Sequence, residues 1–139
     1  MQGVAKPLRQ SANSVFVAPA IFTQDGMPRG PAAARHADTP GMPVVTGQAP
    51  ALPGEWIALF LTGLGVRNPM IMAPEILPAV RLGELQAEVG YSGAAPGFPG
   101  LNQINFKVPP ASPPGQLPLT VSVGSVQSIT AAMAVGRSN

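Results

Sequence analysis

The residues best suited to acid–base or metal chemistry in this chain are one histidine and six carboxylates. His36 and Asp38 lie two positions apart in a proline-rich segment, and His36 is the only histidine in 139 residues. A metal centre needs three or four converging ligands, and catalysis needs paired groups in one shaped environment. The carboxylates are instead spread along the chain: Asp25, Asp38, Glu55, Glu75, Glu84 and Glu88. The sequence therefore predicts a protein that is not an enzyme and that uses no metal and no cofactor.

Three amide side chains form the other polar constellation. Asn102, Gln103 and Asn105 follow a stretch dense in glycine and proline, in YSGAAPGFPGLNQINFKVP (residues 91–109). Such a strip can bind a glycan or a peptide, but amides near the start of a strand commonly cap turn carbonyls, and this second interpretation is favoured. Trp56 can stack on a sugar, yet a single tryptophan in an apolar strand more often packs in the core.

Composition excludes several other classes. The chain has no cysteine, which removes thiolate catalysis, disulfides and iron–sulfur clusters. Eight basic and six acidic residues give a net charge of +2, and the basic residues are scattered, so nucleic acid is not an expected partner. Gly63 and Gly65 in TGLG lack the third glycine and the helix of a phosphate-binding loop. No apolar run approaches the roughly 18 residues that span a membrane, and the first residues lack the apolar region of a signal peptide.

The elements that position these residues are predicted to be strands. Eighteen prolines and 16 glycines indicate many turns and few helices. EWIALFLTGLG (residues 55–65) is a continuous apolar run between turn signals, which predicts a strand buried on both faces. AVRLGELQAEVGYSG predicts a tight hairpin in which Leu85, Ala87, Val89 and Tyr91 alternate with polar residues. About seven such strands predict an all-β sandwich with long Pro/Gly-rich loops.

Smaller features complete this organisation. Residues 1–13 are predicted to be a flexible arm and 14–139 a single domain. The final strand is expected over residues 126–136. The long loops at 36–54 and 66–78 are candidates for binding. Turn geometry is expected to explain the glycines and prolines that precede the amides, namely Gly93, Pro96, Gly97, Pro99 and Gly100.

Several spaced segments resemble an uncharacterised β-rich C-terminal domain family expanded in Solibacter and other acidobacteria. The resemblance covers roughly residues 14–136 and is carried by PGEWIALFLTGLGVRNP, VGYSGAAPGFPGLNQINFKVP and LPLTVSVGSVQSITAAMAV, with APAIFTQDGMPRGPAAARHAD upstream. It implies an immunoglobulin-like β-sandwich at the end of a large secreted or surface protein, hence an extracellular or cell-surface location. It implies no activity. Family members generally carry a further β-rich half before PAIF, so the resemblance leads us to expect either a processed fragment or a stand-alone version here.

Two functions follow as hypotheses. The first is a structural module that assembles with copies of itself into a filament or surface layer, because an apolar strand without its upstream half is a template for another chain. The residues predicted to form this interface are Val15, Phe16, Val17, Ile21 and Phe22. The second is a monomeric adhesion module that binds a surface polysaccharide or protein. Aromatic residues are only 5% of the chain, which favours the first hypothesis, since sugar-binding faces use exposed aromatic rings.

Overall fold

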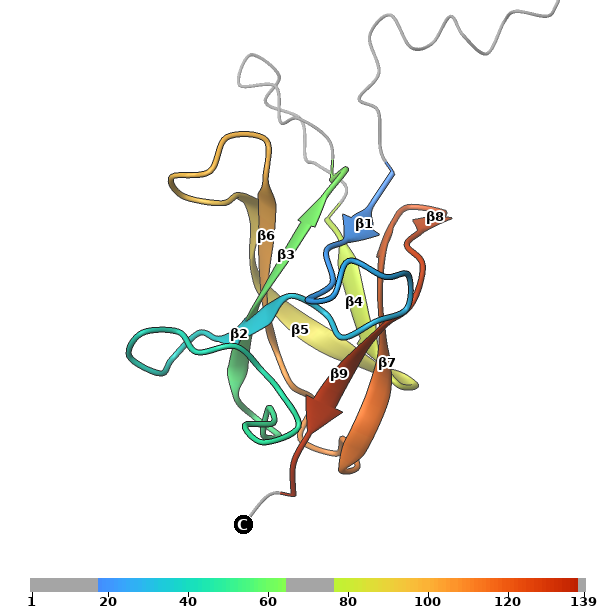
Figure 1. Ribbon diagram of the computed structural model, residues 1–139. Coiled ribbons are helices and arrows are strands. Elements are labelled where there is room, and N and C mark those ends of the chain that lie inside the picture. The colour runs from blue at the N-terminus through green and yellow to red at the C-terminus, as the bar shows by residue number, and fades with distance from the viewer. Residues whose placement is uncertain (1–17, 65–76, 138–139) are drawn as a thin grey trace, which may run out of the picture.

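The computed structural model describes residues 18–64 and 77–137, and every regular element in those ranges is a β-strand (Figure 1). The strands are β1 (Ala20–Ile21), β2 (Ala34–His36), β3 (Trp56–Thr62), β4 (Ala79–Leu82), β5 (Leu85–Ala94), β6 (Asn102–Lys107), β7 (Gly115–Val123), β8 (Val126–Gln127) and β9 (Ala131–Val135). The all-β fold class predicted from the sequence is confirmed.

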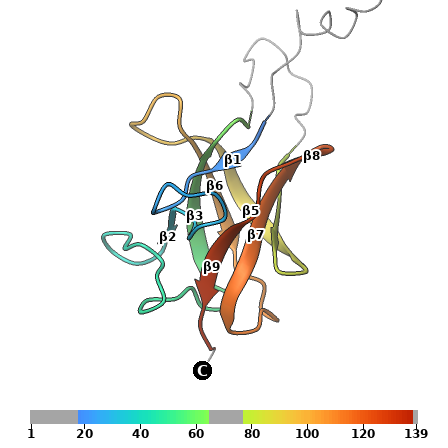
Figure 2. The ribbon, with the colours of Figure 1, turned by 45° about the vertical axis from the view of Figure 1, so that its right-hand side comes forward.

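These strands form one antiparallel sheet that curls around its own core. The order is β1-β3-β6-β5-β4-β7-β8, with β2 also beside β3 and β9 also beside β7. The long strand β5 joins the two halves, because its first residues pair with β4 and its later residues with β6. Figures 1 and 2 show the two halves facing each other across the interior. The described strands are thus nearly a barrel, and the immunoglobulin-like sandwich of two sheets stays a prediction.

The curled sheet is closed by loop segments of the same chain. Pro31 forms a parallel bridge with Ala132, and Ala51 forms one with Val135. The amide of Ala51 donates to the carbonyl oxygen of Ala134 at 2.9 Å. The outer edge of β2 is covered in the same way by residues 43–45. Edge strands that pair with segments of their own chain have few free backbone N–H and C=O groups with which another chain could pair.

The core lies between the two halves and is formed by the inward side chains of alternating strands. On β6, Ile104 and Phe106 point inward and are fully buried, while Gln103 and Asn105 lie on the outer side. The predicted strand at 55–65 is confirmed as β3, with Ile57, Ala58 and Leu59 all fully buried. Its predicted burial on both faces is wrong, because Trp56 and Phe60 on the outer side are only partly buried. The largest fully buried side chains are Phe106, Ile57, Leu59, Leu61, Leu82, Ile104, Leu119, Val80, Val108 and Val121.

The predicted alternation along β5 is wrong beyond Val89, because a bulge interrupts it. Val89 pairs with Phe106, whereas Tyr91 pairs with Asn105, so Gly90 is an extra residue in the ladder. One extra residue turns all later side chains to the opposite face. Tyr91 therefore lies on the outer face, where it is 42% exposed.

The turn residues divide into two groups. Gly97 and Gly100 have φ of +82° and +84°, so the turn interpretation is confirmed for them. Gly93 lies inside β5 instead, with the Tyr91 ring close to it. The strand predicted over 126–136 is two strands, β8 and β9, since Ser128 bonds to Val121 through both backbone and hydroxyl.

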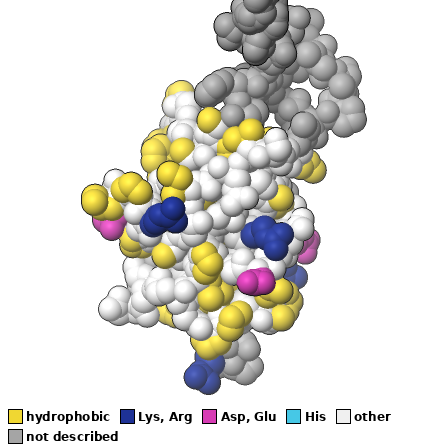
Figure 3. Space-filling model, turned by 90° about the vertical axis from the view of Figure 1, so that its right-hand side faces the viewer, with side chains coloured by type: hydrophobic (Ala, Val, Ile, Leu, Met, Phe, Trp, Pro, Cys, Tyr) yellow, Lys and Arg dark blue, Asp and Glu magenta, His cyan; other side chains and the backbone are white. Residues whose placement is uncertain are grey.

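The surface carries few charges. On the side where β7 and β8 lie, charged side chains are separated from one another by uncharged and apolar ones (Figure 3). This distribution agrees with the scattered cations of the sequence.

Candidate functional site

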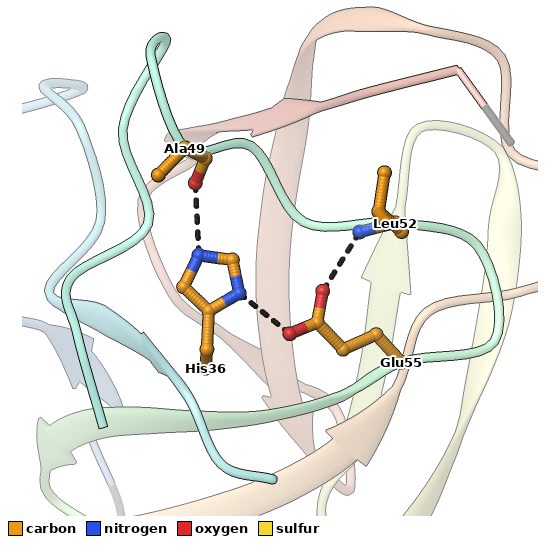
Figure 4. A network of polar contacts seen from close by, with 4 residues as sticks. All are labelled: His36, Ala49, Leu52 and Glu55. Atoms are coloured by element: carbon orange, nitrogen blue, oxygen red, sulfur yellow. Dashed lines mark hydrogen bonds and ion pairs between the residues drawn. The ribbon is translucent and has the colours of Figure 1, made fainter. Parts of the chain in front are cut away.

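His36 and Glu55 form a hydrogen-bonded pair, here called the clasp, that holds the loop between β2 and β3 (Figure 4). The Nε2–H of His36 donates to the carbonyl oxygen of Ala49 at 2.8 Å, and its Nδ1 lies 2.5 Å from Oε2 of Glu55. The second carboxylate oxygen, Oε1, accepts from the backbone amide of Leu52 at 2.9 Å. Because the carbonyl oxygen can only accept, Nε2 of the imidazole carries the hydrogen of that bond. Every polar atom of the pair is thus used to fix the loop.

The pair does not form a metal centre with Asp38. In residues 18–64 and 77–137, no three His, Asp or Glu side chains lie together in a way that would hold a metal ion. An open hollow of about 560 Å³ lies beside the clasp, lined by prolines of the loop together with His36 and Glu55. The predicted binding loop at 36–54 is therefore pinned to the sheet at Ala49 and Ala51.

The remaining described carboxylates have local roles. Asp25 accepts from the amide of Met27 at 2.9 Å, which closes a turn. Glu84 and Glu88 are exposed, as expected for residues flanking a hairpin. Glu75 lies outside the described residues.

The three amide side chains of β6 form two different kinds of hydrogen bond. Oδ1 of Asn102 accepts from the amide of Leu64 at 3.2 Å, so Asn102 has a structural role, but it satisfies a backbone donor rather than the predicted turn carbonyl. Gln103 and Asn105 lie on the outer face, where Nε2 of Gln103 donates to Oδ1 of Asn105 at 2.9 Å. For these two residues the capping interpretation is wrong, because the bond joins them to each other along the strand.

Aromatic side chains surround this amide pair. Cross-strand pairing places Phe60 beside Gln103 and Tyr91 beside Asn105. Trp56 lies four residues before Phe60 on β3, opposite Lys107. The aromatic residues on this outer face are Phe22, Trp56, Phe60 and Tyr91. The whole chain has five Phe, one Trp and one Tyr, and four of these aromatic residues lie on this face. The chain therefore has few aromatic residues, but more than half of them lie together on one face.

Two of these rings lie flat on the sheet. A Cβ atom added at Gly90 would lie 2.9 Å from Cζ3 of Trp56, so the indole reaches from β3 across β6 to β5. Neighbouring strands are about 4.8 Å apart, so the indole must extend across two such spacings. It can do so only when it lies along the sheet. The hydroxyl of Tyr91 donates to the carbonyl oxygen of Ala94 at 2.7 Å, which lays its ring over Gly93.

We call Trp56, Phe60, Tyr91, Gln103 and Asn105 the aromatic–amide face. Trp56 is half-buried on this outer face, so its prediction as a core residue is wrong. The sequence signal for the face is the spacing of Gly90 and Gly93 in β5. A glycine leaves space on the outer side of a strand that a neighbouring ring can occupy.

The charges beside this face are few and of mixed sign. Arg35 is exposed on β2, and Lys107 stands opposite Glu88 in the register of β6 and β5. Such a surface does not select a strongly charged partner.

The predicted assembly interface is described only in part. Val15, Phe16 and Val17 lie outside the described residues. Ile21 pairs with Leu61 and packs against the chain's own core. Phe22 is 45% exposed. The interface stays a prediction, and the structure places Ile21 within its own sheet.

The entry of the chain into β1 is held by a close approach. The amide of Ala18 donates to the carbonyl oxygen of Gly63 at 2.9 Å. Gly63 has φ of +85°, and a Cβ there would lie 1.9 Å from the Ala18 carbonyl oxygen. Gly63 in TGLG thus has a structural role, while Gly65 and most of the predicted loop at 66–78 lie outside the described residues.

Comparison with known proteins yielded no match: no family model, no curated protein sequence and no solved structure matched the chain. Among the described residues no helix is long and apolar enough to cross a membrane.

Proposed function

We propose that this domain is a non-catalytic binding module and that the aromatic–amide face is its binding surface. The observation that carries the proposal is that Trp56, Phe60 and Tyr91 surround one amide pair on one outer face. Aromatic rings supply contact area at little entropic cost, and amides supply both donors and acceptors. The module is proposed to act at the cell surface or outside the cell, as the resemblance implies, on a polysaccharide or a protein.

The sheet supports this function better than the loops do. The long loop between β2 and β3 is fixed by His36 and Glu55, whose polar atoms already have partners. The aromatic–amide face stands on three adjacent strands, which hold its side chains in a fixed arrangement. A binding surface on rigid elements loses less conformational entropy when a ligand binds.

The test is a binding experiment with variants of the face. The whole chain and the double variant Gln103→Ala/Asn105→Ala are mixed with cellulose, chitin, peptidoglycan and immobilised peptides, and the bound fraction is measured. Phe98→Ala removes an aromatic ring that is 61% exposed in the β5–β6 turn and is the matched control. Binding that is lost in the double variant and kept in the control supports the proposal. Binding that survives the double change, or no binding to any probe, contradicts it.

Self-assembly through residues 14–23 is the second candidate. The observation that favours it is Phe22, which is exposed beside the short strand β1 at the edge of the sheet. Ile21 already contributes to the chain's own core, so a chain lacking residues 1–17, rather than 1–23, is the suitable variant. Sedimentation velocity over a range of concentrations measures the mass. Assembly by the whole chain that is lost on truncation supports this candidate, and a monomer at every concentration contradicts it.

A further inference from the structure

We propose that the ligand of the aromatic–amide face is a neutral, extended β-1,4-linked glycan that lies across the sheet on Trp56 and Tyr91. This inference rests on the proposed function and adds the chemical class of the ligand. It follows from the orientation of the rings, the groups of the amide pair that have no partner among the described residues, the balance of charge and the pairing of the edge strands β2 and β9.

The orientation of the rings is the first step. The indole of Trp56 lies along the outer face against Gly90, and the Tyr91 ring lies over Gly93. A ring that lies flat on a sheet can present its other face outward, and Tyr91 keeps 42% of its surface exposed. Pyranose rings have one apolar C–H face that packs on an aromatic ring face. A β-1,4-linked chain is a flat ribbon, so it matches a flat platform, whereas an α-1,4-linked chain coils.

The amide pair supplies the polar contacts. The bond between Gln103 and Asn105 uses one donor of Gln103 and the Oδ1 of Asn105. Each side chain keeps further capacity, because Oε1 of Gln103 is an acceptor and Nδ2 of Asn105 is a donor. A sugar hydroxyl both donates and accepts, so it can bond to either group. The mutual bond also holds the two amides in one orientation before a ligand arrives.

The charge beside the face argues for a neutral ligand. The nearest charged residues are Arg35, Lys107 and Glu88, and they stand on three different strands. Opposite signs on Lys107 and Glu88 offset each other across the register. A polyanion such as a uronic-acid chain needs a cluster of cations, as nucleic acid does.

The closed edges argue against an extended peptide. A peptide that adds to a sheet needs a free row of backbone donors and acceptors. In the described part of the chain, β2 is paired with residues 43–45 and β9 with residues 30–32 and 51. The end strands β1 and β8 have only two residues each, so they offer a peptide few backbone groups, and a ligand gains more from side chains on a face.

A purely structural explanation of the rings makes a different prediction. Aromatic side chains that cover glycines in a neighbouring strand stabilise designed sheets without binding anything. In that case the loss of a ring would lower stability and would change no affinity. Variants that keep the fold but alter the amides separate the two explanations, because the amides stabilise no turn.

The experiment is calorimetric titration of the whole chain with cellohexaose and chitohexaose, with maltohexaose as the α-linked comparison and the β-1,4-linked hexamannuronate as the charged comparison. Trp56 is the only tryptophan, so its fluorescence reports on the same site without a label. We expect saturable binding of one of the first two sugars and a change in emission. We expect Gln103→Ala and Asn105→Ala each to weaken binding about tenfold or less, as for a lost hydrogen bond, and Trp56→Leu to weaken it at least about tenfold. Phe98→Ala and Gln116→Ala should bind as the unaltered chain does.

The outcomes that overturn the inference are distinct from failure of the proposed function. If neither neutral β-linked hexasaccharide binds, or if the α-linked or charged sugar binds as tightly, the ligand class is wrong. A peptide probe that binds through the same face would then leave the proposed function standing. If hexasaccharide affinity is unchanged in the amide and Trp56 variants, both the ligand class and the binding surface are wrong.

Discussion

The two halves of the sheet are alike inside and different outside. On the inner side, β3 and β6 contribute Leu59 and Phe106, and β7 contributes Leu119 and Val121, all fully buried. On the outer side, the first half presents the aromatic–amide face. The second half presents small or polar residues instead: Arg81, Gln86, Gln116, Pro118, Thr120, Ser122 and Ala132.

This difference separates what the fold requires from what it permits. The inner sides must match because they form one core, and close packing leaves little freedom there. Neither half needs aromatic residues on its outer side, since the second half lacks them there and forms the same kind of sheet. Function resides in such sites on a fold and not in the fold itself. The aromatic–amide face is thus the feature that the common core does not explain.

The largest expected effect tests whether the halves share one core. Phe106→Ala removes a fully buried ring from the first half, and Leu119→Ala removes a fully buried side chain from the second. We expect free-energy losses of about 3–5 and about 2–5 kcal/mol, respectively, from lost burial and residual cavities. Urea unfolding followed by both fluorescence and circular dichroism measures the losses. The two probes should report one transition in each variant; separate transitions for the two halves would contradict a shared core.

The next effect concerns how the first half holds the entering chain. Gly63 and Gly54 have nearly equal φ, +85° and +87°, but only Gly63 has a backbone carbonyl where a Cβ would be. Gly54→Ala should cost about 1 kcal/mol from backbone strain alone. Gly63→Ala should cost clearly more, because Ala18 and β1 must also move. Thermal unfolding of the two variants checks this difference, and equal losses would show that the contact of Ala18 with Gly63 is unimportant.

A smaller effect concerns the Trp56 ring. Gly90→Ala places a methyl group against the indole at 2.9 Å, whereas Gly47→Ala meets nothing within 4 Å and has no positive φ. We expect Gly90→Ala to lift the ring, shift the tryptophan emission and cost on the order of 1 kcal/mol. Gly47→Ala should leave the emission unchanged. An unaltered spectrum in Gly90→Ala would mean that the ring does not rest on β5.

The smallest effect is expected on the outer side of the second half. Gln116 is exposed on β7, and Gln116→Ala should change stability by no more than about 0.5 kcal/mol. Glycan affinity should not change either, in contrast to Gln103→Ala. Chemical unfolding and titration with cellohexaose measure both quantities. A weaker affinity in Gln116→Ala would show that the two outer sides do not differ in function.

Sequence patterns predicted the elements better than they predicted the site. The apolar run of β3 and the hairpin of β4 and β5 follow from patterns that the sequence displays directly, and both were confirmed. The outward position of Tyr91 depends on one extra residue at Gly90. A single glycine in a strand does not by itself predict a bulge, so the sequence did not show this change of face. The position of Trp56 depends on the pairing of β3 with β6, beyond which lies β5, and both strands are far from β3 in the chain. The partnership of His36 with Glu55, 19 positions away, was missed for the same reason, because Asp38 was the nearer carboxylate.

The most direct test of the aromatic–amide face is two-dimensional ¹H–¹⁵N NMR of the whole chain during titration with cellohexaose, chitohexaose and a soluble peptide. The signals to follow are the indole N–H of Trp56 and the side-chain amides of Gln103 and Asn105, with the side-chain amides of Gln86 and Gln116 as internal controls. If this face is the binding surface, the first three signals shift and saturate with one ligand while the controls stay fixed. Shifts confined to Gln86, Gln116 or the loop between β2 and β3 would contradict the account, as would the absence of any shift with every ligand.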